Sequence, residues 1–498
     1  MAEMGMTATG APAGTSTPGP HHARRWWILA VICLAQLMDV LDVTVVNIAL
    51  PGAQKELGFS VGDRQWIVTA YSLAFGSLLL LFGRVSDLAG RRVMFLAGLI
   101  AFGAASALGG AAPNFAILVT GRALQGAAGA MLAPAALSLL STTFTEAKER
   151  ATAFAVFGGI SGSGAAVGML LGGVLTEYLD WRWTLFVNVV ISVIAVAGTA
   201  TLIPRRPTSG DRPRLDLPGT LIASAGLFGI VYGFANVESH PWSAPGTWVF
   251  LAGGALLLAM FAWWQTRAAH PVLPPRVIAD RTRGGSHLAI FIGGVGLFGA
   301  FLFLNYYLQE ILRYSPVMTG LAFLPMVGTL VITGGMCTTR LYPRVGAKIP
   351  VFAGMVAAAG GMAWLTGIGQ DSSYAANILG PLLLFGSGIG AIIAPAMNAG
   401  TSGVRPHDAG VASATVNIAQ QIGGSIGIAL LNSLAASALT RSLIGRDATS
   451  PVVAAEAAIH SYTVAFRCSS AIFAVGAVAC GLTLPAGKPG LVEPGSRG

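Results

Sequence analysis

Long apolar stretches alternate with short polar segments along almost the whole chain, from Trp26 to Pro485. Fourteen of these stretches contain about 18 residues or more, the length that a helix needs to cross the hydrocarbon core of a bilayer. Because so little sequence lies between them, we expect no separate aqueous domain. The pattern therefore predicts an all-α membrane protein with 14 transmembrane helices. The predicted spans are 27–50, 66–84, 92–112, 115–142, 150–175, 183–203, 217–238, 247–267, 285–309, 317–339, 349–368, 374–398, 408–434 and 464–485.

The composition supports a membrane location. Hydrophobic residues make up 54% of the 498 residues and charged residues only 10%, whereas a soluble domain carries about 25% charged residues. The net charge of +9 does not indicate nucleic-acid binding, because the basic residues lie in short segments between apolar stretches. The cysteines fall within or at the edge of apolar stretches, so we predict no disulfide. They are Cys33, Cys337, Cys468 and Cys480.

The distribution of basic residues predicts the orientation of the chain. With the N-terminus in the cytoplasm, 21 of the 29 Lys and Arg residues fall on the inner side, seven on the outer side and one within the membrane. This excess follows the positive-inside rule, so we expect a multi-pass protein of the inner (cytoplasmic) membrane with both termini in the cytoplasm. Residues 1–23 are rich in Gly, Pro, Ala, Thr and Ser and are predicted to be disordered. The apolar stretch after Arg25 is longer than a signal-peptide core and is kept as the first helix.

The chain also repeats itself, which defines the architecture more firmly than the number of spans does. RVSDLAGRRVMFLAG (84–98) aligns with RLYPRVGAKIPVFAG (340–354), and GAMLAPA (129–135) aligns with GAIIAPA (390–396). Two halves of six helices in the same orientation are a known transporter architecture, with a substrate cavity where the halves meet. We predict a cytoplasmic tail at 1–23, an N-terminal six-helix bundle at 24–203, a linker with the inserted helices seven and eight at 204–267, a C-terminal six-helix bundle at 268–485 and a cytoplasmic tail at 486–498.

Four stretches carry recognisable motifs, namely LDVTVVNIALP (41–51), GRVSDLAGRR (83–92), RALQGAAGA (122–130) and NYYLQEILRYSPVMTGLAFLP (305–325). Together with a glycine-rich fifth helix, they resemble the major facilitator superfamily and, within it, the fourteen-helix branch of drug/proton antiporters. The resemblance implies a bacterial secondary transporter that exports small hydrophobic drugs or antibiotics across the cytoplasmic membrane. It also implies that export is coupled to proton entry and proceeds by alternating access.

The 83–92 stretch is predicted to form a tight basic turn between the second and third helices, where glycine lets the chain reverse closely. The resemblance implies that its acidic residue latches the two halves together in the outward-facing state. A topology signal made only of positive charge is the alternative, but it would need no acid, and the repeat copy has Pro343 in that place. The residues of this motif are Gly83, Asp87, Gly90, Arg91 and Arg92.

Glycines also recur every four residues in the fifth predicted helix, at Gly164, Gly168 and Gly172, with Gly173 adjacent. This spacing forms a flat face on which another helix can approach closely, and ordinary packing accounts for it. The resemblance adds that exporters carry an antiporter motif here, at the interface between the halves. Met169 stands where that motif commonly has proline, so the helix departs from the motif at the residue that usually bends it.

Three charged residues lie well inside predicted spans, far from the span ends, where an ionisable side chain costs several kcal/mol unless it has a partner or faces a cavity. Asp39 and Asp42 are three residues apart and share one face of the first helix. At about 1.5 Å per residue, Asp42 lies roughly 22 Å from the inner surface, and Arg122 lies roughly 10 Å from the outer surface of a core about 30 Å thick. These depths are similar, so Asp42 and Arg122 could pair.

The resemblance implies that Asp42, at the acidic position of LDVTVVNIALP that the family uses, is the proton carrier, with Asp39 as the alternative. A static ion pair that only holds two helices together would explain the same residues. The second half has no matching charge, because Leu383 aligns with Arg122. Burial in a low dielectric favours the protonated form of a carboxylate, which allows it to load and release protons. The residues predicted to couple protons are Asp42, Asp39, Arg122 and Glu310.

Amide and aromatic side chains of the predicted spans are candidates for contact with the substrate. Amides inside membrane helices could equally link one helix to another, and aromatic rings often lie at the membrane interface. The predicted substrate-binding residues are Tyr71, Asn47, Gln125, Asn305, Tyr306, Asn417 and Gln421.

The sequence carries no signature of an enzyme or of an ATPase, since it lacks a GxxxxGK[ST] loop and a His/Cys cluster with metal-ligand spacing. We therefore expect no metal and no cofactor, with the proton gradient as the energy source. The expected partners are protons, the lipid bilayer and a small hydrophobic substrate, which could be cationic. We expect a monomer. A proton-coupled importer of a small metabolite is the alternative function, whereas a receptor or channel has no need of two half-repeats.

Overall fold

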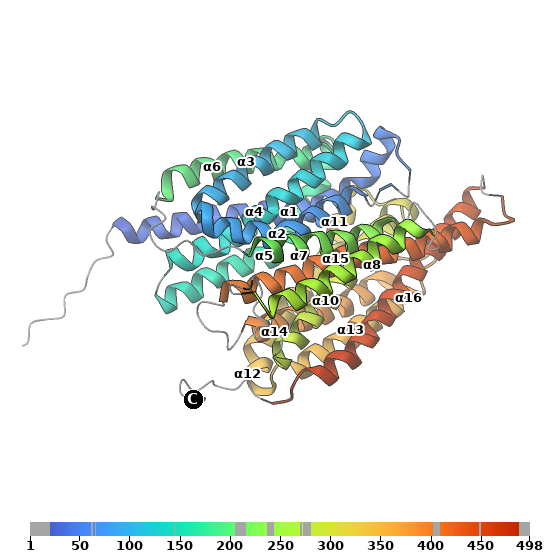
Figure 1. The fold of residues 1–498 in the computed structure, drawn as a ribbon. Coiled ribbons are helices and arrows are strands. Elements are labelled where there is room, and N and C mark those ends of the chain that lie inside the picture. The colour runs from blue at the N-terminus through green and yellow to red at the C-terminus, as the bar shows by residue number, and fades with distance from the viewer. Residues whose placement is uncertain are drawn as a thin grey trace, which may run out of the picture.

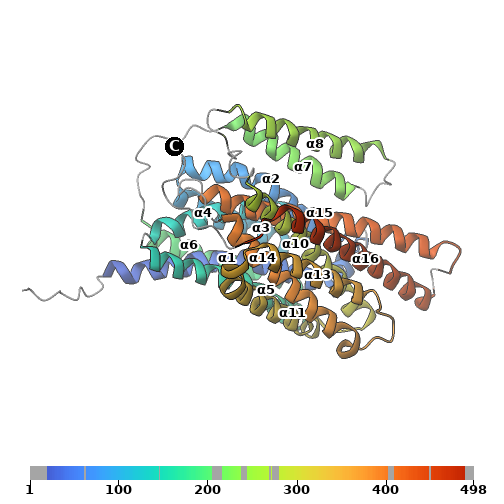
Figure 2. The same cartoon turned by 90° about the horizontal axis from the view of Figure 1, so that it is seen from below.

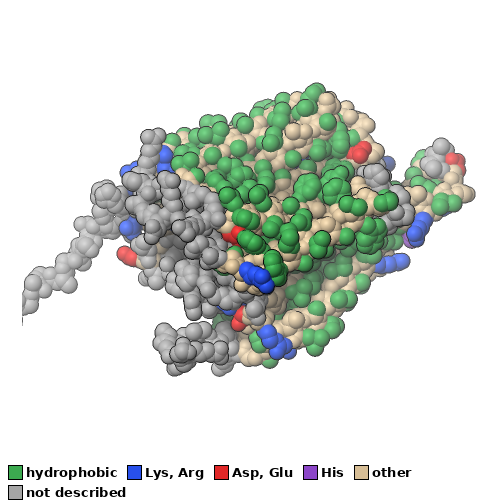
Figure 3. Space-filling model, in the orientation of Figure 1, with side chains coloured by type: hydrophobic (Ala, Val, Ile, Leu, Met, Phe, Trp, Pro, Cys, Tyr) green, Lys and Arg blue, Asp and Glu red, His purple; other side chains and the backbone are tan. Residues whose placement is uncertain are grey.

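The structure is a computed structural model, and it describes residues 20–60, 63–64, 66–144, 146–204, 216–236, 244–268, 271, 280–401, 409–447 and 450–487. This described part is helical and contains no strand, and its long helices run side by side (Figure 1). Twelve of its helices are long and apolar enough to cross a membrane. On the face shown in Figure 3, hydrophobic side chains are spread along the long helices, with few charged side chains among them. The protein is therefore an all-α, multi-pass membrane protein, as predicted.

The N-terminal half is formed by α1 (Pro20–Leu57), α2 (Trp66–Ala89), α3 (Arg91–Gly110), α4 (Phe115–Thr143), α5 (Ala147–Tyr178) and α6 (Trp183–Leu202). Each of these helices overlaps one predicted span. The next two helices, α7 (Leu217–Asn236) and α8 (Pro245–Gln265), overlap the predicted inserted pair. In α2 and α5 the apolar segments are shorter, at Trp66–Leu79 and Val167–Tyr178, so the number of 14 membrane spans stays a prediction.

The C-terminal half is formed by α10 (Arg281–Tyr306), α11 (Pro316–Met336), the short α12 (Tyr342–Val345), α13 (Lys348–Leu365), α14 (Leu379–Thr401), α15 (Ala409–Leu443) and α16 (Pro451–Thr483). Three π-helical turns accompany them. They are η1 (Tyr307–Ile311) and η2 (Cys337–Leu341), which continue α10 and α11, and η3 (Tyr374–Ile378), which leads into α14.

The helices α15 and α16 are longer than predicted. The sequence placed their ends at 434 and 464, but α15 continues to Leu443 and α16 begins at Pro451. Alanine-rich sequence keeps a high helix propensity where the hydrophobicity falls, and proline is favoured in the first turn of a helix. The two helices therefore extend past the apolar stretches that the prediction relied on.

The same local contacts occur at matching positions in the two halves. Gly90 and Gly346, which the sequence repeat aligns, have φ angles of 91° and 74° just before α3 and α13, a conformation that favours glycine. Arg24 donates a 3.1 Å hydrogen bond to a backbone carbonyl at the end of α6, and Arg281 donates one of 3.1 Å to a carbonyl at the end of α16. A basic side chain in this place satisfies a carbonyl that has no partner in its own helix.

Two helix pairs join the halves along opposite seams. We call them the α5/α11 seam and the α2/α15 seam, and α1 also touches α10 between them. The α7–α8 hairpin lies beside the halves (Figure 2), where α7 contacts both α2 and α15. The inserted helices therefore cover one seam and not the other.

Asp216 fastens α7 to α8. Its carboxylate accepts hydrogen bonds from the backbone N–H of Gly219 at 2.9 Å, from Nε1 of Trp264 at 2.8 Å and from Nε2 of Gln265 at 2.9 Å. Asp216 is buried, and these donors satisfy a carboxylate that would be costly to bury alone.

The two ends of the described chain lie at one end of the bundle, which we call the terminal end (Figure 1). The opposite end, with the described segments 58–60, 63–64, 179–182, 307–315 and 444–447, is called the distal end. Every charged contact between the halves described below lies at the distal end.

Candidate transport site

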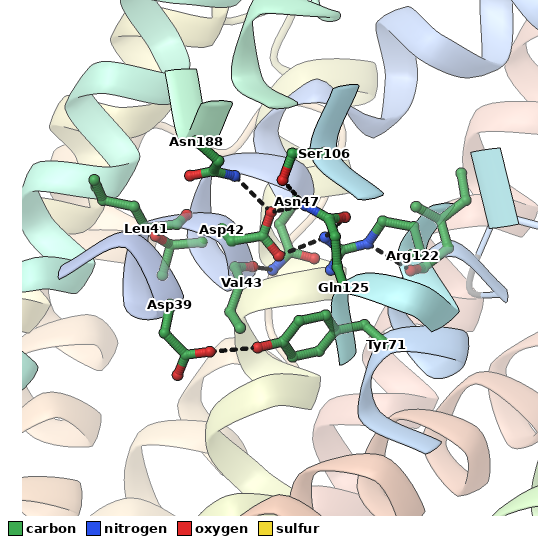
Figure 4. Close-up of polar contacts among 12 residues, drawn as sticks. Asp39, Leu41, Asp42, Val43, Asn47, Tyr71, Ser106, Arg122, Gln125 and Asn188 are labelled. Atoms are coloured by element: carbon green, nitrogen blue, oxygen red, sulfur yellow. Dashed lines mark hydrogen bonds and ion pairs between the residues drawn. The ribbon is translucent and has the colours of Figure 1, made fainter. Parts of the chain in front are cut away.

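A buried polar network lies inside the N-terminal half, centred on Asp42 of α1 (Figure 4). Oδ2 of Asp42 lies 2.5 Å from Nη1 of Arg122 on α4. Its Oδ1 accepts hydrogen bonds from Nε2 of Gln125 at 2.9 Å and from Nδ2 of Asn188 on α6 at 2.8 Å. Asp42 is 0% exposed and Arg122 1%. The similar depths predicted for the two charges therefore correspond to an ion pair.

Arg122 is satisfied by several groups besides Asp42. Its Nε donates to the carbonyl of Ile67 at 3.1 Å, its Nη1 donates to Oε1 of Gln125 at 2.9 Å, and its Cζ lies 4.7 Å from the ring centre of Tyr71. A buried ion pair is tolerated when hydrogen bonds satisfy its remaining atoms. The pair is thus held by α1, α2, α4 and α6 together.

Two members of this network were not predicted. Asn188 donates to Asp42, and Ser106 of α3 accepts a 2.8 Å hydrogen bond from Nε2 of Gln125. Each lies within a mostly apolar helix and is 0% exposed. The amide of Asn188 within α6 was a usable signal, because a polar side chain in a membrane span usually has a partner.

Asp39 lies beside the network but differs from Asp42 in its surroundings. Its Oδ1 accepts a 2.6 Å hydrogen bond from the hydroxyl of Tyr71, and the residue is only partly buried. Gly129 of α4 lets this pair approach, because a Cβ there would lie 3.1 Å from Oδ1 of Asp39 and 3.0 Å from the Tyr71 oxygen. Figure 4 shows the second carboxylate oxygen of Asp39 turned away from the network, without a drawn contact.

The glycine face of α5 lies against α1, as the spacing predicted. Cβ atoms added to Gly164 and Gly172 would lie 3.0 Å from Val40 and 3.1 Å from Val45, and Gly168 faces Thr44 in the same way. The adjacent Gly173 points elsewhere: a Cβ there would lie 2.7 Å from the backbone of Pro316 and of Val317 on α11. Three glycines therefore pack within one half, and the fourth lies at the α5/α11 seam.

A second charged group, the distal cluster, joins the halves near the distal end. It consists of Arg64, Gln54, Glu310 and Tyr462. Nη1 of Arg64 lies 2.6 Å from Oε1 of Glu310, and Oε2 of Glu310 accepts a 2.9 Å hydrogen bond from the Tyr462 hydroxyl. Arg64 also donates to Gln54. Glu310, which was predicted as a coupling residue, thus links the C-terminal half to Arg64 of the N-terminal half.

Two hydrogen bonds between a side chain and a backbone group also join the halves near the distal end. Nδ2 of Asn305 on α10 donates to the carbonyl of Asn47 on α1 at 2.8 Å. The backbone N–H of Val317 donates to Oε2 of Glu177 on α5 at 3.0 Å. The distal ends of the two halves are therefore held together by side-chain and backbone contacts.

Comparison with known proteins adds the family. Residues 32–428 match the sequence profile described as the Major Facilitator Superfamily. The chain belongs to the major facilitator superfamily. It is therefore a membrane transporter and not an enzyme.

Two relatives within the superfamily are similar along most of their length. The chain is 50% identical over 455 residues to the puromycin resistance protein pur8 of Streptomyces alboniger, covering 91% of this chain and 89% of the relative. It is 37% identical over 441 residues to the cephamycin export protein CmcT of Amycolatopsis lactamdurans, covering 88% and 89%.

Solved transporters share the fold. A bacterial homologue of the human lysosomal transporter Spinster, crystallised in an inward-facing and unoccupied conformation, has a TM-score of 0.64 at 15% identity and covers 94% of this chain and 98% of that one. An auto-inhibited peptide transporter of the POT family has a TM-score of 0.65 at 16% identity, covering 93% and 96%. At these identities the likeness concerns the fold alone.

The superfamily turn at 83–92 is only partly described. Gly90 forms the turn before α3, and Arg92 donates to the carbonyls of Ile203 at 2.7 Å and of Ala200 at 3.1 Å, at the end of α6. Gly83 of α2 lies near Pro134 of α4, and Arg91 begins α3. The side chain of Asp87 lies outside the described residues, so its latch role stays a prediction.

The predicted substrate residues are not gathered around one space. Gln125 is enclosed in the Asp42 network, and Tyr71 lies between that network and Asp39. Tyr306 lies under Arg64, whose Cζ is 4.4 Å from its ring centre. Asn417 is partly buried on α15, and the side chain of Gln421 lies outside the described residues. Asn47 and Asn305 contact each other between the halves.

The sequence alignment that placed Leu383 opposite Arg122 in the repeat is wrong by one residue. Gly126 of α4 lies against the backbone of Tyr71, and Gly386 of α14 lies in the same way against the backbone of Met326. Four residues before each glycine are Arg122 and Leu382, which are both 1% exposed, whereas Leu383 is 36% exposed. Leu382 therefore occupies the place of Arg122 in the second half, and this place still carries no charge.

Proposed function

We propose that this transporter exports a small hydrophobic antibiotic from the cytoplasm in exchange for protons. The similarity over about nine-tenths of the chain to proteins named for puromycin resistance and for cephamycin export carries the proposal. The substrate is a hydrophobic compound that can carry a positive charge, and the energy comes from the proton gradient without a cofactor. The protein acts as a monomer.

The proposed topology has 14 membrane spans, with both termini in the cytoplasm. The excess of Lys and Arg on the inner side, 21 against seven, supports this orientation. The terminal end of the bundle then faces the cytoplasm, and the distal end faces outward. The distal cluster and the Asn47–Asn305 contact close the outward side, as an inward-facing state requires.

The coupling is proposed to rest on the carboxylates of the N-terminal half. In one state the site faces the cytoplasm and exchanges a proton for the compound. The halves then rotate, the distal contacts break, and the compound leaves on the outer side, where a proton replaces it. Such a cycle needs a carboxylate that can be protonated in one state and ionised in another, because an unpaired charge in hydrocarbon is too costly to persist.

The direction is tested in inverted membrane vesicles that hold a preformed proton gradient, acidic inside. Adding puromycin should discharge the gradient, because each compound that enters the vesicle interior releases a proton outward. Vesicles without the protein are the control. If right-side-out cells instead accumulate puromycin together with protons, the protein is an importer and the export proposal fails.

A further inference from the structure

The two aspartates of α1 differ in how completely their oxygens are satisfied. Asp42 is 0% exposed, and its oxygens interact with Arg122, Gln125 and Asn188. Asp39 is partly exposed, and Oδ1 accepts one hydrogen bond, from Tyr71. Among the described residues, its Oδ2 has no hydrogen-bond donor (Figure 4). Only Asp39 therefore has a free oxygen that can take up a proton without breaking a contact.

Protonation of Asp42 would have a large cost. A proton on Oδ2 would remove the ionic partner of Arg122, which is 1% exposed and has no other carboxylate within ion-pair distance among the described residues. A charge left alone in a dry interior is strongly destabilising. The geometry thus keeps Asp42 ionised as long as the four helices stay packed.

Tyr71 links Asp39 to the Asp42–Arg122 ion pair. Its ring lies under the Arg122 guanidinium, 4.7 Å from Cζ, and its hydroxyl donates to Asp39 at 2.6 Å. A cation is attracted to the face of an aromatic ring, so the guanidinium helps to hold the ring where its hydroxyl reaches Asp39. The ring also stacks on Phe75, with centroids 5.9 Å apart, so its position is fixed.

We propose that Asp39, outside the acidic position of the superfamily motif, is the proton-exchange site, and that Asp42 and Arg122 remain an ion pair that positions Tyr71. This assignment rests on the proposed proton coupling. An incoming proton forms an O–H bond at Oδ2 of Asp39, while the Tyr71 hydroxyl keeps its hydrogen bond to Oδ1. The proton leaves to water from the same oxygen, and no other bond changes.

The groups that face Asp39 are consistent with this role. Its charged or titratable neighbours are Tyr71 from α2, Arg122 from α4 and Asp42 from its own helix. On α5 the described Glu149 is paired with Arg25 at the terminal end, and Glu177 lies in the last turn at the other end of the helix. The helices α6 and α11 contain no charged residue, and the charged or titratable residues of α10 lie in its first two turns. Tyr71 is thus the group that contacts Asp39 directly, and the two other charges neutralise each other.

Infrared difference spectroscopy of the purified protein tests the assignment, because a protonated carboxyl has its own C=O band. The chain has 20 acidic residues, so the spectra that develop on acidification are compared between the wild type and each variant. We expect one band to disappear in Asp39→Asn and to remain in Asp42→Asn, or in the double variant Asp42→Asn with Arg122→Leu if the single variant does not fold. In Tyr71→Phe the band should change frequency, because the carboxyl loses its hydrogen bond. The control is Asp371→Asn, in an exposed segment of the distal end.

The outcomes separate this inference from the export proposal. If the band persists in Asp39→Asn, or if it disappears in Asp42→Asn instead, the assignment is overturned. If Asp39→Asn does not fold, Asp39→Glu replaces it, and a band that moves to the frequency of a glutamic acid supports the assignment, while an unmoved band contradicts it. Export is measured separately with puromycin in vesicles, so its failure leaves the infrared result valid.

Discussion

The two halves have the same helix contacts but different chemistry inside. Gly126 against α2 and Gly386 against α11 are equivalent close approaches. Four residues earlier, the first half has the buried Arg122 and the second half has the buried Leu382. Arg24 and Arg281 make matching contacts in the two halves. Asp42 follows Arg24 by as many residues as Gly299 follows Arg281, so Gly299 occupies the place of Asp42 and the second half has no acid there.

The neighbouring positions show the same difference. When Gly126 is matched with Gly386, Gln125 corresponds to Phe385. Phe385 is 0% exposed and packs against Phe473, with ring centroids 5.9 Å apart. Polar groups in the first half are thus replaced by apolar residues in the second, namely Leu382, Gly299 and Phe385. Small residues thus maintain the repeated fold, whereas the buried Asp42–Arg122 ion pair occurs in one half and has no counterpart in the other.

The largest effect is expected when Arg122 is replaced by leucine, the residue that stands in its place in the second half. Arg122→Leu should leave Asp42 buried without its ionic partner. This should reduce the free energy of unfolding by about 3 to 5 kcal/mol. We expect little folded protein in detergent, measured by size-exclusion chromatography. The double variant Arg122→Leu with Asp42→Asn should recover much of the yield, since it removes both charges. A normal yield of the single variant would show that the pair contributes nothing to folding.

A smaller effect is expected at the contact between the halves. Gly173→Ala should reduce transport several-fold, because its Cβ would lie 2.7 Å from backbone atoms of Pro316 and Val317 and would push the α5/α11 seam apart. Gly172→Ala is the matched control, because it faces Val45 within the same half at 3.1 Å. Transport in vesicles and cross-linking between cysteines placed on α5 and α11 measure the two effects. Equal cross-linking in both variants would contradict a special role of Gly173 between the halves.

The smallest effect is expected in the distal cluster. Glu310→Gln should weaken its contact with Arg64 by at most about 1 kcal/mol, because Glu310 is partly exposed. That energy shifts an equilibrium between two conformations by about fivefold, toward the state with an open distal end. The accessibility of a cysteine near Arg64 to a membrane-impermeant reagent measures the shift. Glu456→Gln is the control, since Glu456 pairs with Arg446 within the C-terminal half, and an equal response there would mean that the contact between the halves is not what matters.

The sequence predicted the helices well because bilayer thickness sets the length of an apolar span. It also indicated the partnership of Asp42 and Arg122, because their estimated depths agree. It failed where hydrophobicity and structure diverge, as at the ends of α15 and α16, where alanine continues a helix that the apolar pattern has left. The register of Leu382 was missed by one residue, since a short motif cannot define which residue faces inward.

Contacts between distant segments could not be predicted from the sequence. Asn188 and Ser106 are polar residues in mostly apolar helices, and nothing in their own segments shows that Asp42 and Gln125 lie opposite them. Arg64 lies in a short loop that reads as an ordinary charged connection, yet it meets Glu310 across the two halves. The difference between Asp39 and Asp42 likewise depends on which side chains approach from α2, α4 and α6.

The α7–α8 hairpin makes the two seams mechanically unequal. Because Asp216 ties α7 to α8, the hairpin moves as one body, and α7 contacts both α2 and α15. Any rotation that separates α2 from α15 must also detach α7 from one of them, whereas α5 and α11 can part without releasing this third body. We therefore expect the hairpin to add resistance to opening at the α2/α15 seam and none at the α5/α11 seam.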